Sequence, residues 1–275
     1  MDNSWNCTSR IVLLAVELDC HHRKLKMNMK FTDYNSESDI KSFLDNAISL
    51  SSDGSRFYHY TSLTTAIKIF KSKKIHFSKI SSMNDIIENT WCGKQTVKDY
   101  FFCLSQSKEC FGMWAMYGGL KSDKRTNGYI KIAFPKSTLE TILKSGALGV
   151  KAHGLVYANL KGNEHMSSFS SELYFNNETN KNEITITKEF AGYVKDSSWQ
   201  YENEIRLSIN SMSENEYIDF PISKELLLSL KIIPSPIANM DKIKKVFIKE
   251  LSKSYNKTEL ENLFEANEFS GCLRI

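Results

Sequence analysis

The sequence predicts a protein of the α+β class, in which helices and short strands follow one another without a strict strand–helix–strand repeat. Apolar residues at helical spacing, such as Leu63, Ala66, Ile67 and Phe70, predict amphipathic helices. Short runs rich in β-branched and aromatic residues, such as 128–134, predict strands. The chain has 275 residues, of which 41% are hydrophobic and 25% charged, so we expect a substantial hydrophobic core.

The predicted elements divide the chain into two parts. Residues 1–54 contain an apolar strand at 11–16 and an amphipathic helix at 38–50, and the polar stretch 49–54 marks a boundary. We expect this segment to be an N-terminal extension packed on the main domain, residues 55–275. In the main domain, strands are predicted at 57–60, 75–80, 100–104, 128–134, 155–158, 202–209, 217–222 and 231–233, and helices at 63–70, 111–118, 184–194, 224–230, 241–254 and 258–266, with 81–88 as a loop that enters a helix.

Several classes of protein are not supported by the sequence. The apolar run 11–16 is too short to cross a bilayer, and no basic stretch of a signal peptide precedes it. The six cysteines have neither the spacing of a metal site nor that of a small disulfide-rich domain, so we expect reduced thiols, a cytoplasmic location and no membrane partner. No metal site is expected, because the pair His21 and His22 lacks further ligands. Glycine-rich phosphate-binding motifs and the G-x-S-x-G motif are also absent.

The charges are distributed unevenly along the chain. Residues 56–161 contain 17 basic and 6 acidic residues, a net charge of +11, whereas residues 162–219 contain 4 basic and 11 acidic residues, a net charge of −7. A basic surface attracts phosphate groups, either of a dinucleotide or of nucleic acid. The alternative is that the two blocks neutralise each other across the fold.

The motif YENEIRL, residues 201–207, is the strongest chemical signal. Along a strand, Glu202, Glu204 and Arg206 would project from one face, because alternate side chains share a face. Two carboxylates this close resist ionising together, so the pKa of one should rise. Such a pair can orient a hydroxyl group or stabilise a cationic transition state. The alternative is a solvated edge strand whose glutamates pair with an arginine.

Two aromatic motifs supply further candidates. His59 lies in the middle of the predicted strand FYHYTS, where a neutral imidazole could bond a ribose hydroxyl or a backbone carbonyl. In MWAMYGG, Trp114 and Tyr117 are one helical turn apart, and an aromatic ring there could stack on a flat heterocycle. The alternative for each motif is ordinary core packing.

Four motifs occur in the order HYTS, SSMNDIIE, FFCLSQS with MWAMYG and GYIKIAF, and SWQYENEIRL. In this order they resemble a widespread bacterial family of unknown function, with motifs written HYT, NDPxE, MWxxY and WxYExExR. The resemblance covers about 56–236, and Ile86 stands where that family has a proline. The family in turn resembles the ADP-ribosyltransferase superfamily of diphtheria toxin and poly-ADP-ribose polymerases. The implied fold is a split β-sandwich core with surrounding helices and the N-terminal extension.

The resemblance implies NAD as a co-substrate and assigns roles to the motif residues. Glu204 would bond the ribose 2′-hydroxyl and stabilise the oxocarbenium ion as nicotinamide leaves, and Glu202 would orient the acceptor. His59 would hold a ribose, and Tyr117 would stack on the nicotinamide ring. The resemblance also places these side chains around the cofactor: Tyr60, Thr61, Ser62, Trp114 and Arg206, with Thr61 or Ser62 contacting the nicotinamide or a phosphate.

The implied function is that of an NAD-dependent ADP-ribosyltransferase that acts as a toxin, in a toxin–antitoxin pair or in defence against phage. Its acceptor would be RNA, DNA or protein, and an antitoxin protein would be a further partner. One alternative is an NAD glycohydrolase, which gives the ADP-ribose to water. Another is a non-catalytic module that binds nucleic acid or protein and keeps the fold without turnover. A third is that the four motifs are purely architectural.

Overall fold

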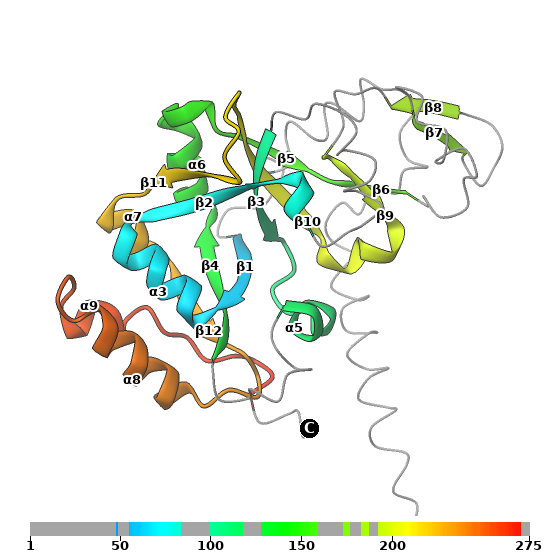
Figure 1. Cartoon of the computed structure of the whole chain (residues 1–275). Coiled ribbons are helices and arrows are strands. Elements are labelled where there is room, and N and C mark those ends of the chain that lie inside the picture. The colour runs from blue at the N-terminus through cyan, green and yellow to red at the C-terminus, as the bar shows by residue number, and fades with distance from the viewer. Residues whose placement is uncertain are drawn as a thin grey trace, which may run out of the picture.

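The computed structural model describes residue 48 and residues 55–83, 99–117, 128–158, 173–176, 183–186 and 192–270. It confirms the α+β class: helices surround an eight-stranded sheet in which the recorded pairings are antiparallel (Figure 1). The strands of this sheet are β1 (Arg56–Ser62), β2 (Lys74–Lys79), β3 (Asp99–Ser105), β4 (Tyr129–Pro135), β5 (Lys151–Gly154), β10 (Glu204–Asn210), β11 (Tyr217–Pro221) and β12 (Lys231–Pro234).

The sheet is not continuous around β3. Strand β10 pairs with β3 along its whole length, so β1 and β2 share the opposite edge of β3. Only Tyr58 of β1 pairs there, with Ser105, and only the end of β2 pairs there, with residues 100–101. Strands β1 and β2 therefore diverge from the middle of β3, and the sheet opens between them. This opening is the feature that positions the candidate site.

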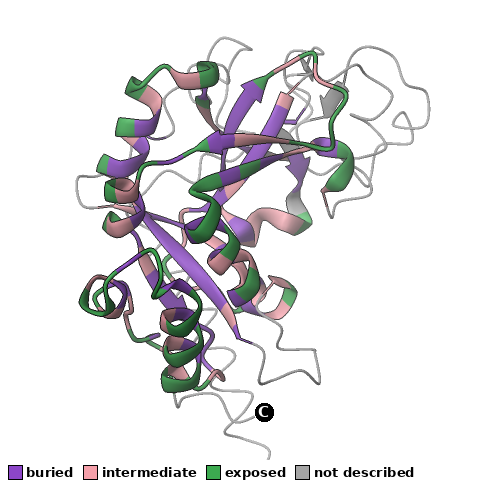
Figure 2. Ribbon diagram, turned by 60° about the vertical axis from the view of Figure 1, so that its left-hand side comes forward, coloured by how far each residue is buried: buried purple, intermediate pink, exposed green. Residues whose placement is uncertain are grey.

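The main hydrophobic core lies on one face of the sheet, under helices α3 (Leu63–Ser72), α6 (Lys136–Lys144), α7 (Lys224–Ser229), α8 (Met240–Leu251) and α9 (Lys257–Glu261). Helix α3 begins where Ser62 accepts a hydrogen bond from the backbone of Thr65, and its buried side chains are those at helical spacing. Figure 2 shows buried strands and helices that expose only their outer faces. Ile48 is also buried in this core.

Helix α5 (Phe111–Tyr117) packs separately from the main core. Its buried residues Met113 and Trp114 lie against Tyr58 and Tyr60 of β1, whereas Phe57 of the same strand faces the main core. The alternation of side chains along β1 therefore joins two cores, one on each face of the strand. The second core, which contains Tyr58 and Tyr60, holds α5 beside the opening in the sheet.

Two small sheets complete the described structure. β6 (Val156–Ala158) pairs in parallel with β9 (Val194–Asp196), and β7 (Leu173–Asn176) forms an antiparallel pair with β8 (Glu183–Ile186). Three 3-10 helices are described, η3 (Ile80–Ser82), η4 (Ala147–Gly149) and η7 (Ser197–Glu202). No helix in the described ranges is long and apolar enough to cross a membrane.

The structure corrects several predicted elements. The helix predicted at 184–194 is wrong at both ends, because β8 covers 183–186 and β9 begins at Val194; the β-branched residues there favour strand. Helix α9 ends at Glu261, earlier than predicted, and β5, β7 and α6 were not predicted from the sequence. The other elements predicted between 57 and 80 and between 100 and 158, and those from 217 to 254, are confirmed within a few residues. The predictions for 11–16, for 84–88 and for 1–54 as a unit lie outside the described residues, except for Ile48.

Candidate functional site

A cavity of about 260 Å³ occupies the opening between β1 and β2. The middle of β3 lines the cavity, β1 and β2 each contribute side chains, and residues of α5, β9, η7 and β10 line it as well. The polar side chains that line it are Tyr58, His59, Tyr60, His76, Ser78, Ser82, Cys103, Ser105, Tyr117, Lys195, Glu202 and Glu204.

The two glutamates reach the cavity by different routes. Glu204 lies in a strand, as predicted, and is the first residue of β10, but Glu202 is the last residue of the 3-10 helix η7. Between them Asn203 adopts the left-handed conformation, with φ 44°, which turns the chain from η7 into the strand. The predicted strand 202–209 is therefore wrong at its first two positions, and strand alternation relates only Glu204 and Arg206. Glu202 and Glu204 nevertheless come together, because both contact Lys195.

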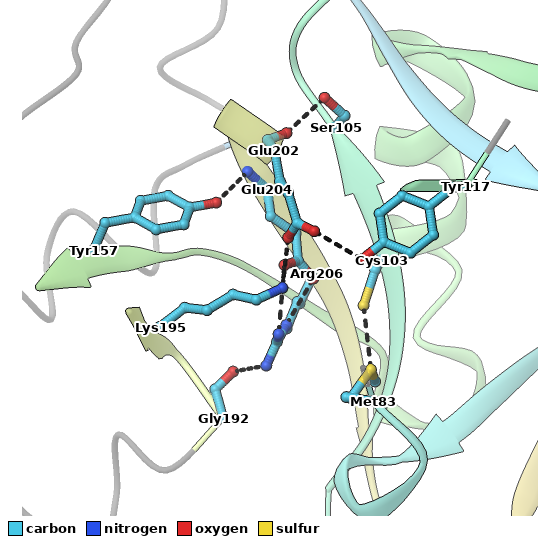
Figure 3. A network of polar contacts seen from close by, with 10 residues as sticks. All are labelled: Met83, Cys103, Ser105, Tyr117, Tyr157, Gly192, Lys195, Glu202, Glu204 and Arg206. Atoms are coloured by element: carbon cyan, nitrogen blue, oxygen red, sulfur yellow. Dashed lines mark hydrogen bonds and ion pairs between the residues drawn. The ribbon is translucent and has the colours of Figure 1, made fainter. Parts of the chain in front are cut away.

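This pair belongs to a buried network of four charged side chains, which also contains Lys195 and Arg206 (Figure 3). Arg206 Nε donates to Glu204 Oε1 at 2.8 Å, and Lys195 Nζ lies 3.2 Å from Glu204 Oε2 and also contacts Glu202 Oε2. Each of the four residues is at most 6% exposed. The interpretation as a solvated edge strand is therefore wrong: β10 lies between β3 and β5, and its charges are compensated inside the protein.

Backbone groups fix the same network in place. Arg206 also donates to the carbonyl of Gly192, and the hydroxyl of Tyr157 accepts a hydrogen bond of 2.8 Å from the backbone N–H of Glu204. Gly192 has φ +90°, and a Cβ atom there would lie 2.6 Å from the ring of Phe101. The position therefore favours glycine, and its carbonyl is held where Arg206 reaches it.

The environment separates the pKa values of the two glutamates. Burial and the neighbouring charge of Glu204 raise the pKa of Glu202 to about 7. Burial also acts to raise the pKa of Glu204, but the charges of Arg206 and Lys195 outweigh it and hold that pKa well below its usual value. Glu204 is thus the ionised member of the pair, and Glu202 can hold or release a proton near neutral pH.

Helix α5 brings Tyr117 to the carboxylate pair. The hydroxyl of Tyr117 donates to Glu202 Oε1 at 2.7 Å, and the ring lines the cavity. Trp114, on the same helix, is fully buried and donates to Glu109 at 3.1 Å. Glu109 in turn pairs with Lys131, whose ammonium group lies 4.8 Å from the ring centre of Tyr58. This buried ion pair anchors the start of α5 on the sheet.

His59 combines both interpretations of the sequence. Its Nδ1 lies 3.0 Å from the carbonyl oxygen of Cys103, and its ring stacks on Phe102 at 4.3 Å, so it is partly a core residue. Burial lowers its pKa, which favours the neutral form. Because a carbonyl only accepts, Nδ1 carries the proton and Nε2 is left as an acceptor. The half-buried ring also lines the cavity, on the β1 side.

Not every predicted site residue lines the cavity. Among the described residues its wall includes His59, Tyr60, Tyr117, Glu202 and Glu204, but four other predicted residues contribute elsewhere. Ser62 caps α3, Trp114 is enclosed in the second core, and Arg206 lies behind Glu204. Thr61 is half-buried at the end of β1, outside that wall.

Strand β2 forms a wall of the cavity that was not predicted from the sequence. His76 and Ser78 line the cavity. The register partner of His76 is Asp219 on β11, and His76 Nδ1 lies 2.5 Å from Asp219 Oδ1. Asp219 also pairs with Lys74 at 3.0 Å. The charge of Lys74, from the basic block, is therefore neutralised by a residue of the acidic block, as one of the two interpretations of the charge distribution expects.

Lys195 and Tyr157 were missed as site residues. A signal for Lys195 was present, because residues 162–219 contain only 4 basic residues and a buried glutamate pair needs compensation. Two of those four, Lys195 and Arg206, supply it. Tyr157 carries no comparable signal, since its contact with Glu204 depends on how β6 packs against β10.

Comparison with known proteins gives one partial match. Residues 113–207 match a family described as a protein of unknown function, DUF2971. The matched range contains Tyr117 and ends just after the YENEIR motif, so it covers the later part of the resemblance drawn from the sequence. No curated protein and no solved structure matches the chain.

Proposed function

We propose that the protein is an NAD-dependent ADP-ribosyltransferase and that the cavity between β1 and β2 is its active site. The observation that carries the proposal is the convergence of three motif segments: FYHYTS supplies His59, MWAMY supplies Tyr117, and YENEIR supplies Glu202 and Glu204 to one cavity. Ligand sites typically occupy about 300–1,000 Å³, so a cavity of about 260 Å³ suits the nicotinamide riboside end of a dinucleotide.

The separated pKa values suit the two steps of ADP-ribosyl transfer. First, the bond between ribose C1′ and the nicotinamide nitrogen breaks, its electron pair leaves with nicotinamide, and positive charge develops on the ribose. A fixed, ionised Glu204 stabilises that charge. The acceptor then forms a bond to C1′ and loses a proton, which Glu202 accepts; a pKa of about 7 suits a general base.

His59 and Tyr117 bind the co-substrate in this proposal. His59 Nε2 accepts a hydrogen bond from a ribose hydroxyl, because its Nδ1 is already bonded to the carbonyl of Cys103. The ring of Tyr117 stacks on the nicotinamide while its hydroxyl holds Glu202. The acceptor is RNA, DNA or protein, and the biological role is that of a toxin that a partner protein restrains.

The test uses NAD labelled in its adenylate part, incubated with the full-length protein and a cell lysate. We expect nicotinamide release, and label that becomes sensitive to RNase, DNase or protease according to the acceptor. Glu204→Gln should reduce nicotinamide release by about 100-fold or more. Glu140→Gln, on the surface helix α6, is the matched control and should leave it unchanged.

Other outcomes decide between the alternatives. Free ADP-ribose without labelled macromolecules indicates a glycohydrolase. Binding of nucleic acid that weakens steeply with salt, with no loss of NAD, indicates a non-catalytic module. Full nicotinamide release by a folded Glu204→Gln variant, with the fold checked by circular dichroism, would rule out the role given to Glu204.

A further inference from the structure

The ammonium group of Lys195 bridges the two carboxylates of the candidate site. It contacts Oε2 of Glu202 and lies 3.2 Å from Oε2 of Glu204, and its side chain is 6% exposed. The ring of Trp199 lies 4.9 Å from the same ammonium group and covers it with an aromatic face. A lysine is rarely buried to this extent without a specific electrostatic partner, and the described residues include two carboxylates in contact with it.

The fold of the chain around η7 places Lys195 next to the two glutamates. Asp196 accepts a hydrogen bond of 3.0 Å from the backbone of Ser198 and so caps η7, which ends at Glu202. The short helix folds the chain back, and Lys195 reaches carboxylates that follow it by seven and nine residues. Its register partner on β6 is Tyr157, which bonds the backbone of Glu204. The small sheet β6–β9 therefore contacts β10 at Glu204, through the adjacent side chains of Tyr157 and Lys195.

The two cations of the network are not equivalent. Arg206 donates to both oxygens of Glu204, at 2.8 and 3.4 Å, whereas Lys195 contacts both glutamates. Glu204 therefore keeps a cation if Lys195 is removed, and Glu202 loses its ion-pair contact. Among the residues that the structure describes, the other groups that face Glu202 carry no positive charge: the hydroxyl of Tyr117 on α5, Tyr157 on β6, Tyr201 on η7 and the carboxylate of Glu204.

We propose that Lys195 is a positioning residue that bridges the carboxylates of Glu202 and Glu204, fixes them in one geometry and favours the loss of the proton from Glu202. Its ammonium group favours the ionised form of both, and Arg206 adds to this effect at Glu204 alone. When the pair binds a proton, that proton therefore resides on Glu202, and the charge of Lys195 favours its release. The catalytic consequence rests on the proposed function, whereas the electrostatic part does not require any turnover of NAD.

The electrostatic part is tested by titration of the glutamate side chains with carbon-detected NMR, with Glu202→Gln used to assign the signal. In the wild-type protein the pKa of Glu202 is expected near 7. Lys195→Met keeps the apolar stem and removes the charge, so the pKa of Glu202 should rise by about one to three pH units. Lys195→Arg restores the charge and should return the pKa toward the wild-type value. Lys249→Met, on the exposed face of α8, is the control and should not change it.

A second measurement covers the case in which Lys195→Met folds poorly. Removing one partner of a buried ion pair leaves the other uncompensated. The double variant Lys195→Met/Glu202→Gln removes both, so it should regain most of the stability that the single variant loses. Losses that simply add in this double-mutant cycle, or a titration of Glu202 that Lys195→Met leaves unchanged, would overturn the proposal.

Kinetics separate this inference from the proposed function. We expect Lys195→Met to lower kcat at neutral pH by about tenfold or more with little change in KM, because the carboxylates are misplaced and Glu202 is protonated. Activity should recover partly at higher pH and in Lys195→Arg. An unchanged kcat in Lys195→Met would refute the catalytic role of Lys195. A wild-type protein that does not turn over NAD would refute the proposed function, but the titration would still test the contact of Lys195 with the two glutamates.

Discussion

The hydroxyl group of Tyr117 donates a hydrogen bond of 2.7 Å to Oε1 of Glu202, a residue 85 positions later in the chain. This contact joins α5, which packs on β1, to η7, which leads into β10. It therefore links the helix motif to the acidic motif in the wall of the cavity. The same tyrosine presents its ring to the cavity, so one side chain serves both the carboxylate and the ligand space.

Removal of this hydroxyl should raise the pKa of Glu202 while the aromatic ring at the cavity wall is kept. In Tyr117→Phe the ionised form of Glu202 loses a donor, so the pKa of Glu202 should rise above its value of about 7. The expected loss of stability is about 1–3 kcal/mol, typical of a hydrogen bond to a charged group. NMR titration and urea unfolding measure the two effects. Tyr217→Phe, at an exposed site on β11, is the control; an unchanged titration of Glu202 in Tyr117→Phe contradicts the assignment.

Glu202 should also make stability depend on pH. The folded protein keeps the proton of Glu202 up to about pH 7, whereas an unfolded chain releases it near 4.5. Between these values the folded state binds more protons, so stability should fall by about 3 kcal/mol as pH rises from 4.5 to 7. The lowered pKa of Glu204 affects stability only below this pH window. The lowered pKa of His59 makes stability rise with pH below 6.5, which is opposite to the effect of Glu202.

The contribution of Glu202 is isolated by comparison with Glu202→Gln. The difference in unfolding free energy between wild type and variant, from urea unfolding at several pH values, should decline over this window, because the other groups cancel. Glu140→Gln, on α6, is the matched control, because it removes one carboxylate outside the buried network. A flat difference for Glu202→Gln would mean that Glu202 titrates normally.

The buried ion pair under α5 should tolerate replacement of both partners better than loss of one. Lys131 is fully buried, 2.6 Å from Glu109, and faces the rings of Tyr58 and Trp114. Lys131→Met leaves a largely buried carboxylate and should cost about 3–5 kcal/mol, whereas Lys131→Met/Glu109→Leu should recover most of that loss. Thermal unfolding monitored by tryptophan fluorescence measures both. A double variant as unstable as the single one would show that the pair is needed for more than charge compensation.

An alanine within α5 should destabilise the protein, although alanine favours helices. At Gly112 an added Cβ would lie 2.7 Å from the ring of Tyr201, which follows the end of β9 in η7. Helix propensity alone predicts a gain of about 1 kcal/mol for Gly112→Ala. We expect a net loss instead, of about 1–3 kcal/mol, because the ring must move. Tyr201→Leu should relieve the contact, so the double variant Gly112→Ala/Tyr201→Leu should be more stable than Tyr201→Leu alone in thermal unfolding.

The sequence by itself determined the class of the fold and most of its elements, because periodicity and turn residues act over a few positions. The helix at 63–70 and the strands at 57–60 and 100–104 follow directly from local apolar patterns, and the structure has them as α3, β1 and β3. The sequence also selected Glu202, Glu204, Tyr117 and His59, since paired acids and aromatics with polar groups are unusual enough to stand out. The predicted function remains a proposal.

Tertiary structure decided what local patterns cannot express. Whether Glu202 belongs to a strand depends on the left-handed Asn203 and the cap at Asp196, not on alternation. The partners of Glu204 come from β9, β6 and β10, and their assembly depends on how a small sheet meets a large one. The pKa difference between the two glutamates follows from that assembly, because desolvation and the positions of two cations set it. The sequence supplied the charged groups, and the packing of Lys195 and Arg206 against the two glutamates determined which of them can hold a proton.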